Sequence, residues 1–223
     1  MIKIDKPCLI VTGGKIDKTL LLDVTKKRNY FVIGVDKGLE ILEQLKMEPD
    51  LVIGDFDSAN NGIRVKYVTS PDAIVRNKCI VLNPQKDFTD THIAILEAME
   101  RGAKEIVLLG ATGTRLDHTM ANLGLLFLCL RSGVSAELLD THNRITLIDR
   151  DKCLYKDKLY GPFISLLPAT EVVRDITLKG FKYDAENLSL KQGETIGISN
   201  ELREEEGHIS IGDGCLFVME TKD

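Results

Sequence analysis

Leu51-Val52-Ile53-Gly54-Asp55-Phe56-Asp57-Ser58 is an apolar run that ends in two closely spaced carboxylates. In an extended backbone, residues two apart project to the same side, so Asp55 and Asp57 converge while Phe56 packs on the other side. Two like charges placed together need a cation, and carboxylate oxygens suit a hard ion such as magnesium. The stretch therefore predicts a strand followed by a divalent-metal site. A turn after a strand is the alternative, because Asp, Ser and Gly are ordinary turn residues.

Similar apolar runs recur along the first part of the chain, separated by helical patterns. The predicted strands lie near residues 8–11, 31–35, 51–53, 79–82, 106–109 and 136–139. This alternation predicts an α/β domain with a parallel, Rossmann-like sheet over residues 1–148. After about Arg150 the pattern changes to short alternating segments with glycine-containing turns. That change predicts a smaller all-β sandwich over residues 149–223.

A second group of carboxylates lies in Lys86-Asp87-Phe88-Thr89-Asp90, where a loop leaves the fourth predicted strand. A helix is expected to start at Asp87 or Thr89, which puts Asp87 and Asp90 in its first turn. Its apolar face is expected to carry Ile95, Leu96 and Met99. Capping of free amides explains one acidic residue in a first turn better than two. The second acid is therefore a candidate functional residue.

The third group is the loop Gly110-Ala111-Thr112-Gly113-Thr114-Arg115-Leu116-Asp117-His118, between a predicted strand and a long apolar helix over about 116–130. Its glycines let the backbone approach a phosphate, which would gain helix amides and a forked contact from Arg115. The glycines could instead only close a tight connection. No Walker motif occurs, and Gly13-Gly14-Lys15 is too short to count as one. His118 is expected to be a structural residue rather than a catalyst.

Composition excludes several classes of protein. The net charge of -5 over 223 residues offers no basic surface for a nucleic acid, but it is compatible with a nucleotide held by magnesium. The longest apolar stretch, Met120 to Leu130, is too short to span a bilayer, and no charged leader is seen at the N-terminus, so we expect a cytoplasmic protein without membrane partners. The five cysteines and four histidines show no disulfide or zinc-ligand spacing.

Taken in order, these motifs resemble those of the thiamine pyrophosphokinases. Five stretches carry the resemblance: Val35-Asp36-Lys37-Gly38, residues 49–58, residues 86–90, residues 110–122, and Gly197-Ile198-Ser199-Asn200-Glu201. Any one of them could arise by chance, whereas five in the family's order over nearly the whole chain make an accidental match improbable.

The resemblance implies transfer of the β,γ-diphosphate of ATP to the hydroxyl of thiamine, which gives thiamine diphosphate and AMP. It implies magnesium held by Asp55, Asp57, Asp90 and Asp117, with Arg115 assisting as a further catalytic residue. It implies that Asp87 or Asp90 orients or deprotonates the alcohol. The ATP side would comprise Asp36, Lys37, Lys86, Gly110, Thr112, Gly113, Arg115 and His118.

The thiamine side would be formed by Ser199 and Asn200 together with Asp87 and Asp90, and the family pairs its chains as homodimers with sites at the subunit interface. The chain lacks tryptophan, which some members stack on the pyrimidine, and Thr114 stands where a second glycine is common. Two other readings stay open at this point. The chain could be a magnesium- and ATP-dependent diphosphotransferase or kinase for another small alcohol, or a sensor without catalysis.

Overall fold

The computed structural model describes residues 3–56, 61–72 and 78–223. The chain forms two compact units, Met1–Thr141 and His142–Asp223. This division assigns residues 142–148 to the second unit, whereas the sequence-based boundary at 148/149 assigned them to the first. Among the described residues, no helix is long and apolar enough to cross a membrane.

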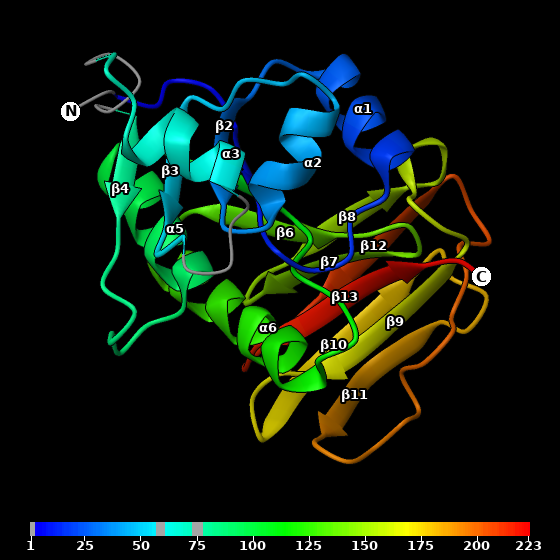
Figure 1. Cartoon of the computed structure of the whole chain (residues 1–223). Helices are drawn as coiled ribbons and strands as arrows, with labels where there is room; N and C mark the ends of the chain where they lie inside the picture. Colours follow the sequence, from blue (N-terminus) through cyan, green and yellow to red (C-terminus); the bar gives the residue numbers. More distant parts are fainter. Residues whose placement is uncertain (1–2, 57–60, 73–77) are drawn as a thin grey trace. The chain divides into compact units, whose positions relative to one another are not determined.

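The first unit is built on six parallel strands in the order β4-β3-β2-β1-β5-β6 (Figure 1). Their bounds are β1 Cys8–Val11, β2 Phe31–Val35, β3 Leu51–Gly54, β4 Cys79–Val81, β5 Glu105–Leu109 and β6 Ser135–Leu139. The three central strands β1, β2 and β3 are buried along their whole length, as expected for parallel strands covered on both faces. All six strands predicted from the apolar runs are present.

Helices cover both faces of this sheet (Figure 1). They are α1 Lys18–Lys27, α2 Gly38–Gln44, α3 Asn61–Ile63, the π-helical turn η1 Arg64–Val68, α5 Asp90–Glu100 and α6 Leu116–Arg131. The chain runs outward from β1 to β4 and then returns across the sheet to β5. Because parallel crossovers are right-handed, this reversal puts α1 and α2 on one face and α5 and α6 on the other. The reversal also opens a crevice between the carboxyl ends of β1 and β5, where open sheets bind ligands.

The start of α5 differs in detail from the sequence-based expectation. The helix begins at Asp90, and Thr89 is its N-cap, accepting a hydrogen bond from the His92 amide at 3.2 Å. Asp87 therefore lies outside the first turn and is exposed. Of the three residues expected on its apolar face, Ile95 is buried and Met99 is partly buried, but Leu96 is 36% exposed. Thr91, Ala94 and Ala98 complete the buried face.

The second unit consists almost wholly of antiparallel strands. Three pair in the order β7-β13-β9 and four in the order β11-β10-β12-β8. Their bounds are β7 Asn143–Ile148, β8 Lys152–Tyr155, β9 Phe163–Pro168, β10 Val172–Lys179, β11 Ala185–Lys191, β12 Glu206–Ser210 and β13 Leu216–Thr221, with the 3-10 turn η2 at Lys156–Lys158. One hydrophobic cluster takes side chains from both sets, including Leu166, Ile176 and Val218. The expected all-β domain with two packed layers is confirmed.

Candidate active site

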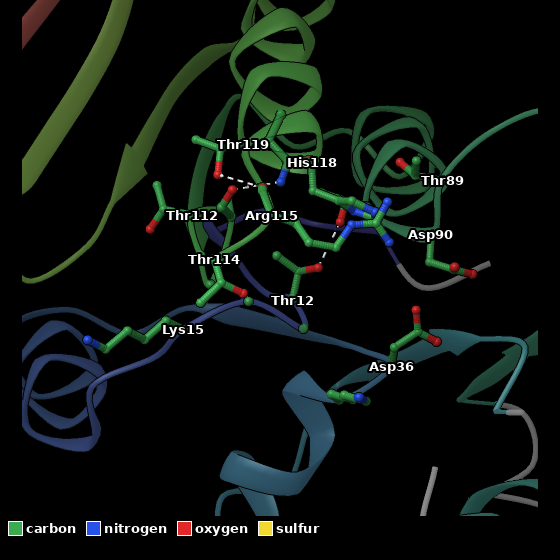
Figure 2. A pocket seen from close by; sticks show the side chains of 18 residues that line it. Thr12, Lys15, Asp36, Thr89, Asp90, Thr112, Thr114, Arg115, His118 and Thr119 are labelled. Carbon is green, nitrogen blue, oxygen red and sulfur yellow. Dashed lines mark hydrogen bonds between the residues drawn. The ribbon is translucent and has the colours of Figure 1, made fainter. Parts of the chain in front are cut away.

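A cavity of about 610 Å³ lies at the carboxyl ends of the parallel strands in the first unit (Figure 2). Segments that follow β1, β2 and β5 line it, together with the first residues of α5 and α6. It therefore occupies the crevice created by the reversal of strand order. Eight of the predicted site residues line it: Asp36, Lys37, Asp90, Gly110, Thr112, Gly113, Arg115 and His118.

Two loops close against each other along one wall of the cavity. The Gly14 amide donates to the Gly110 carbonyl at 2.8 Å, and the Lys15 amide donates to the Thr112 carbonyl at 2.9 Å. A Cβ on Gly14 would lie 2.2 Å from the Gly110 oxygen, so only glycine permits this approach. The Gly-Gly pair after β1, set aside as too short for a Walker motif, is thus part of the site. Its signal in the sequence was the pair of glycines directly after a strand.

Hydroxyl and amide side chains form hydrogen bonds that hold the segments of this wall together. Thr12 and Thr91 share a buried hydrogen bond between their hydroxyl oxygens, 2.7 Å apart, which joins the end of β1 to α5. Asn122 donates from Nδ2 to the Ala111 carbonyl at 2.8 Å and so ties α6 to the loop before it. Asn122 is the last residue of the stretch 110–122 that carried the family resemblance, whereas sequence reasoning did not single out Thr12 and Thr91, which lie in segments without a motif of their own.

At one end of the cavity, the ammonium group of Lys86 lies between two carboxylates, and a third carboxylate, that of Asp36, lies close to one of them. Lys86 Nζ lies 3.0 Å from Asp55 Oδ2 and 3.1 Å from Asp90 Oδ1. Figure 2 shows the side chains of Asp36 and Asp90 pointing toward one another. Three acids against one lysine leave the cluster with a net negative charge. Such a cluster of oxygen ligands is suited to a hard divalent cation.

Among these acids, Asp36 combines a buried carboxylate with an unusual backbone conformation and a raised pKa. It follows β2 with a left-handed backbone, φ 46°, and its Oδ1 is buried without a hydrogen-bond partner among the described residues. A Cβ on Gly54 would lie 2.3 Å from that oxygen, so the glycine at the end of β3 makes room for it. Burial, and then the charge of Asp90, raise the pKa of Asp36 to about 7. A bound cation would relieve both penalties, so the residues present fit a magnesium ion.

The start of α6 offers a different chemistry. Arg115 holds the N-cap position and makes no capping bond with its side chain, which instead forks onto Asp117 with Nε 3.2 Å from Oδ1. Both side chains are more than half exposed. The hydrogen bond from Arg115 lowers the pKa of Asp117. An uncapped helix terminus carrying an arginine is suited to binding a phosphate.

The remaining predicted residues lie outside the cavity lining. Asp55 and Lys86 adjoin it through Asp90, whereas Asp87 and Asp117 are exposed and are not among the lining residues. Asp57, like Ser58, lies outside the described residues. Phe56 is buried, as expected, but its φ of 58° shows that the strand has already ended. The backbone at Phe56 is thus left-handed rather than extended as expected, and the convergence of Asp55 and Asp57 stays a prediction because it depends on a residue outside the described ranges.

Ser199 and Asn200 lie in the second unit, in the turn before β12. Ser199 is exposed, has a left-handed φ of 56°, and donates from its amide to Ser165 Oγ at 3.0 Å. Asn200 is buried, and its side chain bonds the Tyr183 backbone twice, donating to the carbonyl at 2.9 Å and accepting from the amide at 3.1 Å. Asn200 thus shapes the turn, and Ser199 is the exposed side chain.

Comparison with known families agrees with this division of the chain. A sequence model for the "Thiamin pyrophosphokinase, catalytic domain" matches residues 22–138, and one for the "Thiamin pyrophosphokinase, vitamin B1 binding domain" matches residues 148–216. The chain belongs to the thiamin pyrophosphokinase family. The cavity and its carboxylate cluster lie within the stretch that matches the catalytic domain, except for residues 12–15. Ser199 and Asn200 lie within the vitamin B1 binding domain.

Individual members of the family are similar over nearly the whole chain. The thiamine pyrophosphokinase of Bacillus subtilis is 32% identical over 96% of this chain and 98% of that protein. Its crystal structure superposes with a TM-score of 0.86 at 31% identity, covering 98% of this chain and all of the other. The structure of the enzyme from Geobacillus thermodenitrificans superposes with a TM-score of 0.81 at 31% identity, covering 97% of each chain.

Membership of this family establishes the general activity. The chain has the catalytic and vitamin B1 binding domains of a thiamine pyrophosphokinase, a kinase that uses ATP and thiamine. The resemblance inferred from five short motifs is therefore confirmed.

Proposed function

We propose that this protein transfers the β,γ-diphosphate of ATP to the hydroxyl of thiamine in the cavity of the first unit. The observation that carries this assignment is the juxtaposition of two features in one cavity of the catalytic domain. Loops and an uncapped helix suited to phosphate line it, and Asp36 and Asp90 place carboxylates suited to a cation at one end. Both are needed when a highly charged diphosphoryl group is transferred.

Magnesium is the proposed cofactor, held by Asp55 and Asp90 with Asp57 and Asp117 as further ligands. The convergence of Asp55 and Asp90 on Lys86, together with the buried Oδ1 of Asp36, supports the first pair. Asp57 lies outside the described residues, and the carboxylate of Asp117 would have to leave Arg115 to bind the ion. When bound, magnesium would neutralise charge on the phosphates and so favour attack on them.

The protein's own residues would then bind and orient ATP. We assign the phosphates to the start of α6 and to Arg115, whose exposed guanidinium can exchange Asp117 for a phosphate oxygen. Lys37, Lys86, Gly110, Thr112, Gly113 and His118 complete the proposed ATP side. Thr112 is held in place because its hydroxyl donates to Asp140 Oδ2 at 2.9 Å. This arrangement aligns the reacting groups, which accounts for much of catalysis in phosphoryl transfer.

Asp87 or Asp90 would orient the alcohol and take its proton. Asp90 lines the cavity, whereas Asp87 is exposed three residues earlier, so the structure favours Asp90 in this role. A carboxylate is a weak base for an alcohol, so the proton would leave late in the transfer.

Thiamine would be recognised by Ser199 and Asn200 in the second unit, and the active protein would be a homodimer. Ser199 presents a hydroxyl on a turn that Asn200 holds rigid through the Tyr183 backbone. We expect Ser199→Ala to raise the KM for thiamine several-fold while the KM for ATP stays nearly constant. Equal changes in both constants would place Ser199 outside the thiamine site.

The decisive assay resolves the products of a reaction that contains ATP, magnesium and thiamine, with omission of each as a control. AMP and thiamine diphosphate in equal amounts would support the proposal. ADP with thiamine monophosphate would show an ordinary kinase and overturn the diphosphoryl step. Turnover of another small alcohol in place of thiamine would support the alternative substrate, and ATP binding without any product would indicate a sensor.

A further inference from the structure

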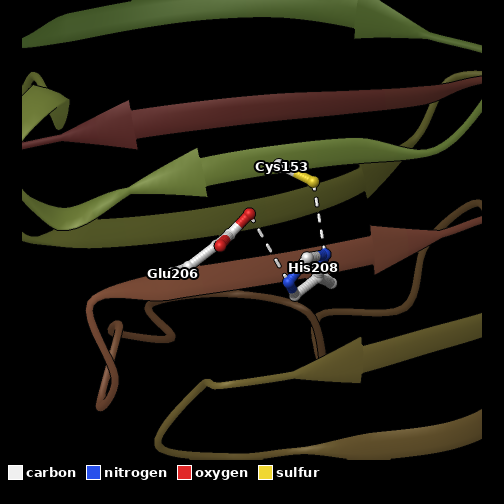
Figure 3. Close-up of side chains that lie close together, drawn as sticks. All are labelled: Cys153, Glu206 and His208. Carbon is white, nitrogen blue, oxygen red and sulfur yellow. Dashed lines mark hydrogen bonds and ion pairs between the residues drawn. The ribbon is translucent and has the colours of Figure 1, made fainter.

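A cluster of three side chains lies in the second unit, and none of the three is among the site residues described above. Cys153 on β8 lies next to Glu206 and His208 on β12 (Figure 3). We propose that these three residues bind a divalent transition-metal ion, of which Zn²⁺ is the best suited. The histidine and cysteine spacing in the sequence indicated no zinc site, because the ligands come together only through strand pairing.

The sheet geometry places the three side chains on one face. Cys153 and His208 are direct cross-strand partners, and Glu206 stands two residues before His208 on the same strand. Because successive residues in a strand alternate between faces, all three project to the same side. Their neighbours Leu154 and Ile209 project to the other side and belong to the hydrophobic core. The cluster is thus mounted on a packed sheet, with Cys153 and His208 exposed and Glu206 partly exposed.

The distances are close to those of a metal site. Cys153 Sγ lies 3.2 Å from His208 Nδ1, and His208 Nε2 lies 3.5 Å from Glu206 Oε1. One ligand atom from each residue can be chosen so that all lie within 4.8 Å of one another. Tetrahedral zinc with bonds of about 2.0–2.3 Å has ligands roughly 3.5 Å apart, so small side-chain rotations would bring one ring nitrogen, the sulfur and one oxygen onto a single ion. Water would take the fourth position.

The chemistry of the ligands and their charges also favours such an ion. Thiolate and imidazole select zinc and similar metals over the hard magnesium ion proposed for the cavity. A thiolate and a carboxylate together balance a divalent cation. Lys179, the partner of His208 on β10, and Tyr155, opposite Glu206, complete the immediate surroundings.

A bound ion would stabilise the edge strand of this sheet. β8 is the outermost strand of the order β11-β10-β12-β8, and it is held on one side by β12. A metal bridging Cys153 to Glu206 and His208 would cross-link the two strands by side chains as well as by backbone. Binding to the folded state alone raises stability. Zinc should therefore raise the melting temperature of the protein.

The test is a Zn²⁺ titration of the untagged, full-length protein against a chromophoric chelator, with excess magnesium present to occupy the carboxylate cluster. Cys153→Ser and His208→Gln should each weaken zinc binding at least tenfold and abolish the rise in melting temperature. Cys215→Ser and His142→Gln are matched controls in the same unit and should bind as the wild type does. Co²⁺ in place of zinc should give a thiolate charge-transfer band that disappears only in Cys153→Ser.

Unchanged zinc affinity in both Cys153→Ser and His208→Gln would overturn the proposal, as would a cobalt complex without a band that depends on Cys153. Because both side chains are exposed, the variants should keep the wild-type circular dichroism spectrum. Their thiamine diphosphate formation in magnesium alone should also be unchanged, which separates this site from the catalytic one.

Discussion

The buried position of the Asp36 carboxylate depends on a glycine on the neighbouring strand. Its carboxylate oxygen occupies the space that a side chain at Gly54 would fill, only 2.3 Å from a Cβ built there. Its backbone is left-handed, which a non-glycine residue adopts at a cost. Both features lie at the edge of the cavity, and both cost stability, which fits the cation binding proposed for this cluster.

Gly54→Ala should therefore cost activity by displacing Asp36. We expect a loss of at least tenfold in kcat/KM, with an increased requirement for magnesium. Gly124→Ala is the matched control, because nothing lies within 4 Å of a Cβ at that helical position. The control should raise stability by about 0.5–1 kcal/mol, since alanine favours a helix over glycine. Steady-state kinetics at several magnesium concentrations and thermal unfolding would check both; equal kinetics in the two variants would contradict the role given to Gly54.

The raised pKa of Asp36 also predicts how stability depends on pH. The folded state holds a proton on Asp36 up to about pH 7, whereas the unfolded chain releases it near pH 4. Between these values the native state binds more protons, so the contribution of this group to stability falls as the pH rises. In chelator, Asp36→Asn should gain stability relative to the wild type as the pH increases from about 5 to 8.

Melting temperatures of Asp36→Asn and the wild type over that range would test this expectation. Magnesium should raise the melting temperature of the wild type most at the upper end of the range, where Asp36 is ionised. A difference in melting temperature between the two proteins that does not vary with pH would contradict the raised pKa of Asp36.

Helices α1 and α5 both begin with a side-chain N-cap, but the caps have different consequences. Asp17 caps α1 by accepting from the Leu20 amide at 2.9 Å, and Thr89 caps α5 by accepting from the His92 amide. Of these two helices, only α5 carries a cavity residue, Asp90, in its first turn. Thr89→Ala and Asp17→Ala should each lose about 1 kcal/mol of stability. Activity should fall in Thr89→Ala alone, because the first turn that holds Asp90 loosens.

Denaturant unfolding and product formation, measured on both variants, would test this pair. Thr89→Ser keeps the capping oxygen and should restore both properties. An equal effect of the two alanine variants on activity would mean that capping of α5 does not position Asp90.

The whole chain carries a catalytic unit followed by a vitamin B1 binding unit. In the proposed homodimer, the active sites would lie at the subunit interface. Light scattering of the purified protein should then give twice the chain mass of 24.8 kDa. A mass equal to one chain under assay conditions, with full activity, would contradict the dimer.

Local patterns in the sequence determined the elements of this fold. Strands such as Phe31–Val35 and Leu51–Gly54 are continuous apolar runs, and α6 is a long apolar segment after glycines, so each is visible within a few residues. The same reasoning selected Asp36, Asp90 and the loop after β5 as candidates, because open parallel sheets bind ligands at the carboxyl ends of their strands, and all of them line the cavity. It misplaced Asp87, which lies before the N-cap of α5, and it did not anticipate the left-handed backbone of Phe56 after β3.

Only the tertiary structure decided which of these residues meet. Gly14 touches the loop after β5, Lys86 bridges acids from two elements, and Cys153 faces His208 across 55 residues of sequence. Such contacts depend on strand order and register, which are set by the packing of distant segments. Sequence periodicity carries no information on that register beyond the choice of face. The elements were therefore readable from the chain alone, whereas the cavity, its charge balance and the proposed zinc site arose from long-range pairing.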